Sequence, residues 1–126
     1  MTATRTVTVQ TSDHGPVTIP CPLWCTGLYH QEGGARIDIT HTGPETELTL
    51  PTSIGPVRHM ATVLEQRPFT EGPTGRGVFV DVEIDGQYHP TGPHGLDAMA
   101  DALVENAAAL RATARRLTTL LAQEGK

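Results

Sequence analysis

CPLWCTGLYH, residues 21–30, contains both cysteines of the chain, its only tryptophan and one of its six histidines. The chain has 126 residues, of which 37% are hydrophobic and 4% aromatic. A single core built mainly from aliphatic side chains has a thin stability margin at this size. A metal clamp or an oligomer interface would widen that margin. The gathering of thiols and imidazole in this stretch is where such a clamp is expected.

The spacing of the cysteines and of two histidines provides four metal donors. The second cysteine follows the first by four residues, a histidine comes five residues later, and another comes eleven residues after that. Two thiolates and two imidazoles form a complete tetrahedral set for zinc, which binds sulfur and nitrogen ligands. The sequence therefore predicts a structural zinc site within a motif spanning residues 21–41. The predicted ligands are Cys21, Cys25, His30 and His41.

The fourth ligand and the state of the cysteines have alternatives. His14 competes with His41, and we favour His41 because it ends a predicted strand beside the motif, whereas His14 lies in a turn before it. A Cys21–Cys25 disulfide and two unrelated core cysteines both remain open. A reducing compartment favours metal ligands or thiols over a structural disulfide. Trp24, between the cysteines, would shield the site from water.

The motif resembles one in an uncharacterised family of small actinobacterial, Streptomyces-type proteins. Those proteins carry Cys-Pro-x-Trp-Cys, then a histidine, then a second histidine preceded by an acidic residue, followed by strands and an Ala/Leu-rich helix. The matching residues here are Cys21, Pro22, Trp24, Cys25, His30, Asp38 and His41. The resemblance implies the metal site and the fold. It implies no activity, because the family's function is unknown.

Alternation of apolar and polar residues predicts short strands over the first two thirds of the chain. Glycine and proline separate these segments and indicate turns. The predicted strands cover residues 4–10, 15–20, 35–40, 45–51, 57–66 and 77–85.

The last part of the chain has a different pattern. From Leu96 there is no proline, no glycine precedes Gly125, and alanine and leucine dominate. This composition predicts a helix over about residues 95–122. Acidic residues near its start and arginines towards its end suit the helix dipole. The expected fold is a single α+β domain, residues 1–126, with a mostly antiparallel sheet of about five or six short strands and one long C-terminal helix.

The predicted helix carries an apolar seam with a period of 3.5 residues, as in coiled coils. The seam consists of Ala100, Leu103, Ala107, Leu110, Ala114, Leu117 and Leu121. We expect the turns around Leu117, Leu120 and Leu121 to pair with a second copy or with a protein partner. A helix lying obliquely across the strands of its own sheet is the alternative.

Other polar groups are interpreted as structural. Asp81, Glu83 and Asp85 share one face of a predicted strand, and a solvated sheet face explains them better than acid–base catalysis. His89 and His94 are expected to be exposed loop histidines. The glycine-rich GPTGRG segment lacks the Lys-Ser or Lys-Thr pair and the following helix of a phosphate loop.

Charge and hydropathy limit the partners. The net charge of −5 argues against broad binding to nucleic acid. The sequence contains no run of about 18 apolar residues, so it predicts no membrane span. The N-terminal MTATRTVTVQ lacks the apolar segment of a secretory signal, so we expect a cytoplasmic protein.

The function that fits best is a small zinc-binding module, regulatory or adaptor in kind, that binds another protein. One alternative is a zinc-dependent hydrolytic enzyme. There, Cys21, Cys25 and one histidine would leave an open metal position, and Glu32 would act as a base. A second alternative is a DNA-binding regulator that uses the arginines of the helix.

Overall fold

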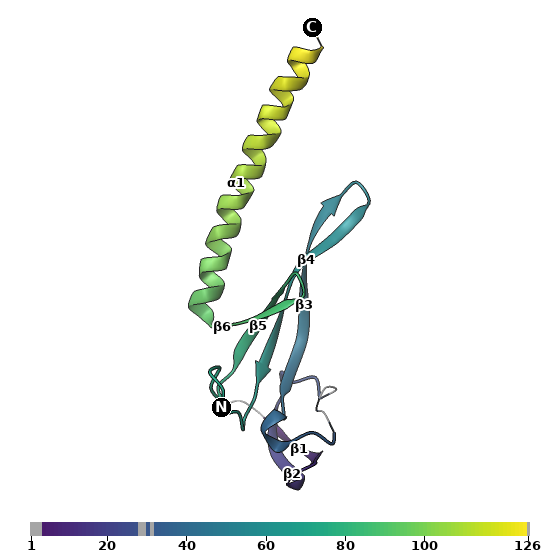
Figure 1. Cartoon of the computed structure of the whole chain (residues 1–126), viewed down its shortest axis with the longest axis vertical. Helices are drawn as coiled ribbons and strands as arrows, with labels where there is room; N and C mark the ends of the chain where they lie inside the picture. The colour runs from purple at the N-terminus through teal and green to yellow at the C-terminus, as the bar shows by residue number, and fades with distance from the viewer. Residues whose placement is uncertain (1–3, 28–29, 31, 126) are drawn as a thin grey trace. The chain divides into compact units, whose positions relative to one another are not determined.

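The computed structural model describes residues 4–27, 30 and 32–125, which form two β-sheets and one α-helix (Figure 1). One sheet pairs β1 with β2, and the other has the strand order β3-β4-β5-β6. All neighbouring strands are antiparallel. The strands are β1 (Thr4–Thr11), β2 (Gly15–Pro22), β3 (His41–Thr52), β4 (Gly55–Gln66), β5 (Phe79–Ile84) and β6 (Gln87–Thr91). The predicted α+β class is confirmed, with two sheets in place of one.

The chain divides into two compact units, Met1–Thr91 and Gly92–Lys126. The first unit contains all six strands, and the second contains α1 (Pro93–Glu124). Among the residues that the structure describes, no helix is long and apolar enough to cross a membrane.

The β1–β2 hairpin owes its core to the alternation seen in the sequence. Val9 and Ile19 point to one face and are buried together with Ile39 from the following loop. On the opposite, exposed face, the hydroxyl oxygens of Thr8 and Thr18 lie 2.8 Å apart. This small apolar cluster is the only buried hydrophobic cluster found in the described part of the chain.

The prediction of a strand over residues 35–40 is wrong. A single turn of 3-10 helix, η1 (Arg36–Asp38), stands there instead. Only one of its two alternating isoleucines reaches the core, because Ile39 is 2% exposed whereas Ile37 is 41% exposed. His41 therefore does not end a strand but begins β3.

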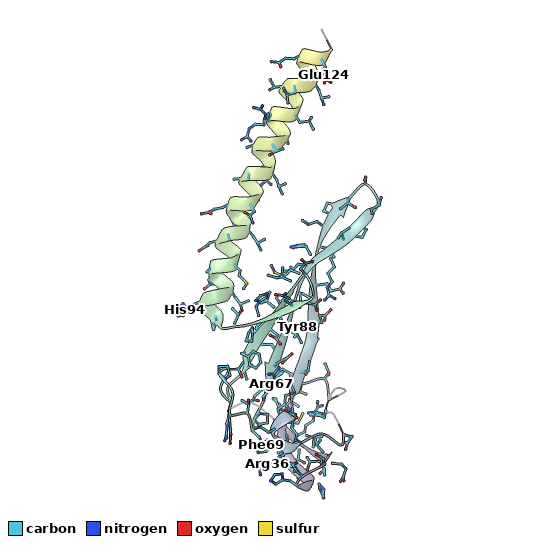
Figure 2. All side chains as sticks on the ribbon, viewed as in Figure 1. Arg36, Arg67, Phe69, Tyr88, His94 and Glu124 are labelled. Atoms are coloured by element: carbon cyan, nitrogen blue, oxygen red, sulfur yellow. The ribbon has the colours of Figure 1, made fainter. Side chains whose placement is uncertain are left out.

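A cation–π contact supports the loops around this hairpin. The guanidinium carbon of Arg36 lies 4.4 Å from the centre of the Phe69 ring (Figure 2). Phe69 itself packs against the cluster of Val9, Ile19 and Ile39. The segment after β4 is thereby joined to the two-stranded sheet.

The sheet ends in a strand that the sequence pattern missed. Asp85 and Gly86 have φ values of 56° and 81°, as a tight Asp-Gly hairpin turn requires, and they connect β5 to β6. β6 contains Pro90, which an edge strand tolerates because one side of it needs no hydrogen bonds. His89 is exposed as expected, although it lies in this strand and not in a loop.

The acidic row of β5 is not the solvated face expected from the sequence. Asp81 is 5% exposed, and one of its carboxylate oxygens has no hydrogen-bond partner among the described residues. Burial first, and the neighbouring Asp81 second, raise the pKa of Glu65 on β4. Glu83 is paired at 2.6 Å with Arg58, and Asp85 alone of the three is exposed in the turn. Part of the row is therefore buried.

The helix extends beyond both predicted ends. Gly92 is its N-cap and Pro93 its first residue, where the fixed φ of proline suits helix initiation. Its 32 residues span about 48 Å at 1.5 Å per residue. The dipole argument does not apply, because no acidic residue lies in the first turn and no basic residue lies in the last. Asp97 and Arg116 are both too far inside the helix.

Candidate metal centre

Two strands and the chain between them bring the four predicted donors together. Cys21 lies near the end of β2, Cys25 follows in a turn, His30 belongs to the next loop, and His41 begins β3. The backbone N–H of Cys25 donates to the carbonyl of Pro22 at 3.0 Å. That turn folds the second cysteine back towards the first.

The donor atoms have separations that suit one small ion. The sulfurs of Cys21 and Cys25 lie 3.8 and 3.7 Å from His30 Nε2. The same nitrogen is 3.1 Å from His41 Nδ1. All four donors lie within 4.8 Å of one another. A tetrahedral zinc ion would place sulfur and nitrogen ligands about 3.5 Å apart and two nitrogens about 3.3 Å apart. The cluster can therefore hold a metal ion.

The cluster is largely closed to water. Cys21, Cys25 and His41 are at most 3% exposed, and His30 is partly buried. Both cysteines are free thiols. The second ring nitrogen of His30, Nδ1, is buried without a hydrogen-bond partner among the described residues. The donors are thus neither joined by a disulfide nor exposed on the surface.

Burial also shifts the pKa values of Cys21 and His41. It raises the pKa of the Cys21 thiol, and a hydrogen bond with Arg5 acts in the opposite direction. It lowers the pKa of His41, as does the nearby His30, while a hydrogen bond to the backbone of Pro20 raises it. Proline has no N–H, so the Pro20 group is its carbonyl, and the ring of His41 is the donor. A neutral imidazole is ready to bind a metal, whereas the thiol has to lose a proton on binding.

Arg5 is a contributor that the sequence interpretation missed. It lies on β1 opposite Cys21 in the hairpin register. Its Nη2 donates to the carbonyl oxygen of Cys25 at 2.6 Å. Gly27, with φ 73°, lets the chain pass the guanidinium, because a Cβ there would lie 3.3 Å from the same nitrogen. The hairpin register, centred on the turn after β1, is the signal from which this pairing follows.

Trp24 forms one wall of the cluster. Its ring meets that of His41 edge-on, with centroids 6.5 Å apart and an interplanar angle of 79°. Gly43 permits this approach, since a Cβ there would lie 3.3 Å from the Trp24 carbonyl and 3.4 Å from its ring. The N–H of Thr26 donates to the carbonyl of Thr42 at 2.9 Å, which fastens the cysteine turn to β3.

Two other residues considered from the sequence lie outside this group of donors. His14 lies in the β1–β2 turn, where its Nδ1 is 3.0 Å from a carboxylate oxygen of Asp13. Six to seven residues of extended strand separate it from Cys21, which corresponds to about 20 Å. Glu32 accepts a hydrogen bond of 2.8 Å from the N–H of Gln10 on β1.

The chain belongs to the DUF6907 family, a domain of unknown function whose model matches residues 6–119. The match includes all four donors and most of α1. It agrees with the expectation of an uncharacterised family, while the actinobacterial source and the shared motif stay predictions. No curated protein and no solved structure matches the chain.

Proposed function

We propose that the four donors bind one zinc ion as a structural site, in a small regulatory or adaptor module that binds another protein. The observation that supports this most is the convergence of two sulfurs and two imidazole nitrogens within 4.8 Å of one another. Zinc suits the set because soft thiolates and imidazoles in a tetrahedral arrangement are its usual structural ligands. The donors are Cys21, Cys25, His30 and His41.

A structural role is favoured over a catalytic one. Four protein donors would fill a tetrahedral ion and leave no position for water or substrate. Glu32 is the possible base of the hydrolytic alternative, but its carboxylate accepts a hydrogen bond from the backbone of β1. A DNA-binding role has little support, because the net charge is −5 and the described residues form one α-helix, whereas a helix-turn-helix needs two.

The ion would stabilise the unit that contains the strands. Among the described residues of that unit, the buried hydrophobic cluster has three members, Val9, Ile19 and Ile39. Zinc held by Cys21 on β2 and His41 on β3 would connect the two-stranded sheet to the four-stranded one. Because binding energy at such a site is also folding energy, the metal would compensate for the small core.

The proposed interaction role rests on features of the surface outside the metal site. A closed zinc site offers no reactive group, whereas α1 exposes several large apolar side chains, among them Leu110 and Leu117. Exposed apolar stripes of this kind mark surfaces that bind other proteins. Free thiols at the donor positions also fit a reducing, cytoplasmic compartment.

The metal part is tested on protein purified without chelator or affinity tag. Elemental analysis is expected to find one zinc per chain. Cys21→Ser and Cys25→Ser should lose the metal and also melt at a lower temperature. Thr18→Ser, on the exposed face of β2, is the matched control and should change neither. A metal-free wild-type protein with both thiols free would refute the site, and loss of zinc without loss of stability would refute its structural role.

The interaction part is tested separately, by capture from the native cell extract. Wild type is expected to retain a defined protein that Leu117→Glu does not retain. Ala112→Glu places the same charge on the opposite side of α1 and should retain it. Equal capture by all three proteins would count against the helix as the binding surface.

A further inference from the structure

The second unit of the chain contains a long helix with no buried residue. Leu110, Leu117 and Leu121 are 68%, 54% and 56% exposed, although each is a residue that folding normally removes from water. Figure 2 shows side chains projecting from α1 along its whole length, from His94 to Glu124. The helix unit by itself leaves this stripe of leucines uncovered, so another surface has to cover it.

The spacing of the stripe specifies what kind of partner fits. Leucine recurs every seven residues, at Leu96, Leu103, Leu110 and Leu117. Alanine recurs every seven residues between them, at Ala100, Ala107 and Ala114. With Leu121 these residues form the Leu/Ala seam. A repeat of seven keeps a seam facing another helix that winds around it. The partner is therefore a helix of similar length.

Residue sizes along the Leu/Ala seam favour a second α1 running in the opposite direction. If two copies cross at the helix midpoint, between Ala108 and Ala109, nearly every small residue faces a large one. The facing pairs are Ala100 with Leu117, Leu103 with Ala114, Ala107 with Leu110, and Leu96 with Leu121. A parallel pair would set alanine against alanine and leucine against leucine. Helices a constant distance apart pack better when large faces small.

The charges flanking the seam lead to the same orientation. On one flank of the seam, the N-terminal half of α1 carries Asp97 and Asp101. On the same flank, the C-terminal half carries Arg111 and Arg115. An antiparallel pair brings the acidic half of each helix beside the basic half of the other, whereas a parallel pair brings like charges together.

We propose that α1 binds the α1 of a second copy as an antiparallel coiled coil through the Leu/Ala seam. The contact is self-complementary, as a two-fold dimer requires, because each half of the helix matches the other half. The proposal rests on the interaction role proposed above and names the partner. It does not depend on zinc.

Sedimentation velocity on the full chain, from low to high micromolar concentration, tests the pairing. Wild type is expected to reach a mass of two chains. Leu110→Glu puts a charge at the centre of the seam and should weaken dimerisation at least about 100-fold. Ala112→Glu, on the opposite side of the helix, should dimerise like wild type. A wild-type monomer at high micromolar concentration, or a dimer that tolerates Leu110→Glu, would overturn the proposal.

Charge reversal tests the orientation. In Asp97→Arg/Asp101→Arg the flank of the seam is basic in both halves of the helix, so an antiparallel dimer should weaken about tenfold. Adding Arg111→Glu and Arg115→Glu exchanges the two halves and should restore wild-type affinity. In a parallel dimer the first variant only replaces acid–acid contacts with base–base contacts. Unchanged affinity would therefore overturn the antiparallel arrangement.

Zinc content measured on the same samples separates this proposal from the metal site. A monomer with one zinc per chain overturns the pairing and leaves the zinc site standing, and a dimer without zinc does the reverse. If Leu110→Glu lowers the melting temperature of a monomer without changing its mass, the seam is covered within its own chain. That result also overturns the proposal.

Discussion

The metal centre and the C-terminal helix are stabilised by opposite means. In the first, donors from β2, β3 and the loop between them meet in a buried cluster, so its order depends on residues distant in sequence. In the second, 32 residues form a helix without burying one of them. Its order depends on the helix propensity of alanine and leucine. The two regions should therefore respond to different perturbations, and variants in one should leave the other intact.

The largest effect is expected from His41→Ala. The ring is 2% exposed and carries one donor, so the variant loses metal and leaves a cavity. We expect zinc occupancy to fall and the free energy of unfolding of the strand-containing unit to drop by about 3 kcal/mol or more. His14→Ala removes an exposed ring and should do neither. Elemental analysis and thermal unfolding check both variants, and zinc loss from His14→Ala alone would contradict the assignment.

A smaller effect is expected from Arg5→Met, which keeps the length of the side chain but removes its hydrogen bonds. The carbonyl of Cys25 loses its 2.6 Å donor, and the free energy of unfolding should fall by about 1–2 kcal/mol. Zinc affinity should fall about tenfold or more, as when the hydrogen-bond partners of metal ligands are removed. The control is Arg36→Met, because the guanidinium that this variant removes lies over the Phe69 ring. Equal zinc affinities of the two variants, measured by competition with a chromogenic chelator, would refute a role for Arg5.

Glu65→Gln is expected to change the stability of the strand-containing unit without changing its zinc content. Burial and Asp81 raise the pKa of Glu65, so its protonated form is favoured in the folded state. Its stabilising contribution is present below the unfolded pKa and disappears as pH rises through the folded value. Glutamine has no charge to desolvate, so the variant should be more stable than wild type at neutral pH, by up to about 1 kcal/mol.

Urea unfolding of Glu65→Gln and wild type between pH 4 and pH 8 checks this prediction. The difference in unfolding free energy should grow as pH rises, with zinc content unchanged. A variant less stable than wild type at neutral pH would show that the carboxylate is stabilising there.

The smallest effect is expected from Ala112→Gly in the exposed middle of α1. Glycine costs about 1 kcal/mol in a helix interior, so helix content measured by circular dichroism should fall. Zinc content and the unfolding of the strand-containing unit should not change. Zinc loss in this variant would show that the two regions are not independent.

Patterns in the sequence predict the local parts of the structure well. β1, β2, β4 and β5 lie where residues alternate, and the part of α1 after Gly95 lies where glycine and proline are missing. Periodicity reports which face a side chain takes, but it does not report whether a neighbouring strand or core exists. Residues 35–40 alternate correctly, yet only Ile39 finds a core, and no strand forms.

The predicted donors were chosen by residue type, whereas their surroundings depend on tertiary structure. The approach of Trp24 to Gly43 arises from contact between separate segments, and the pairing of Arg5 with Cys21 depends on a hairpin register that the sequence interpretation did not use. Asp81 is buried where it pairs with Val63 of β4, which its own strand pattern does not reveal, so that pattern indicates a solvated face instead. Chemistry concentrated in one short motif can be read from the sequence, and chemistry assembled across strands cannot.

The central claim is that Cys21, Cys25, His30 and His41 close around one zinc ion. X-ray absorption at the zinc edge of the purified wild-type protein tests it most directly. The account predicts two sulfur neighbours at about 2.3 Å and two nitrogen neighbours at about 2.0 Å, with no oxygen in the first shell. A protein without zinc, or a zinc ion with an oxygen neighbour in place of one histidine, would contradict a closed structural site.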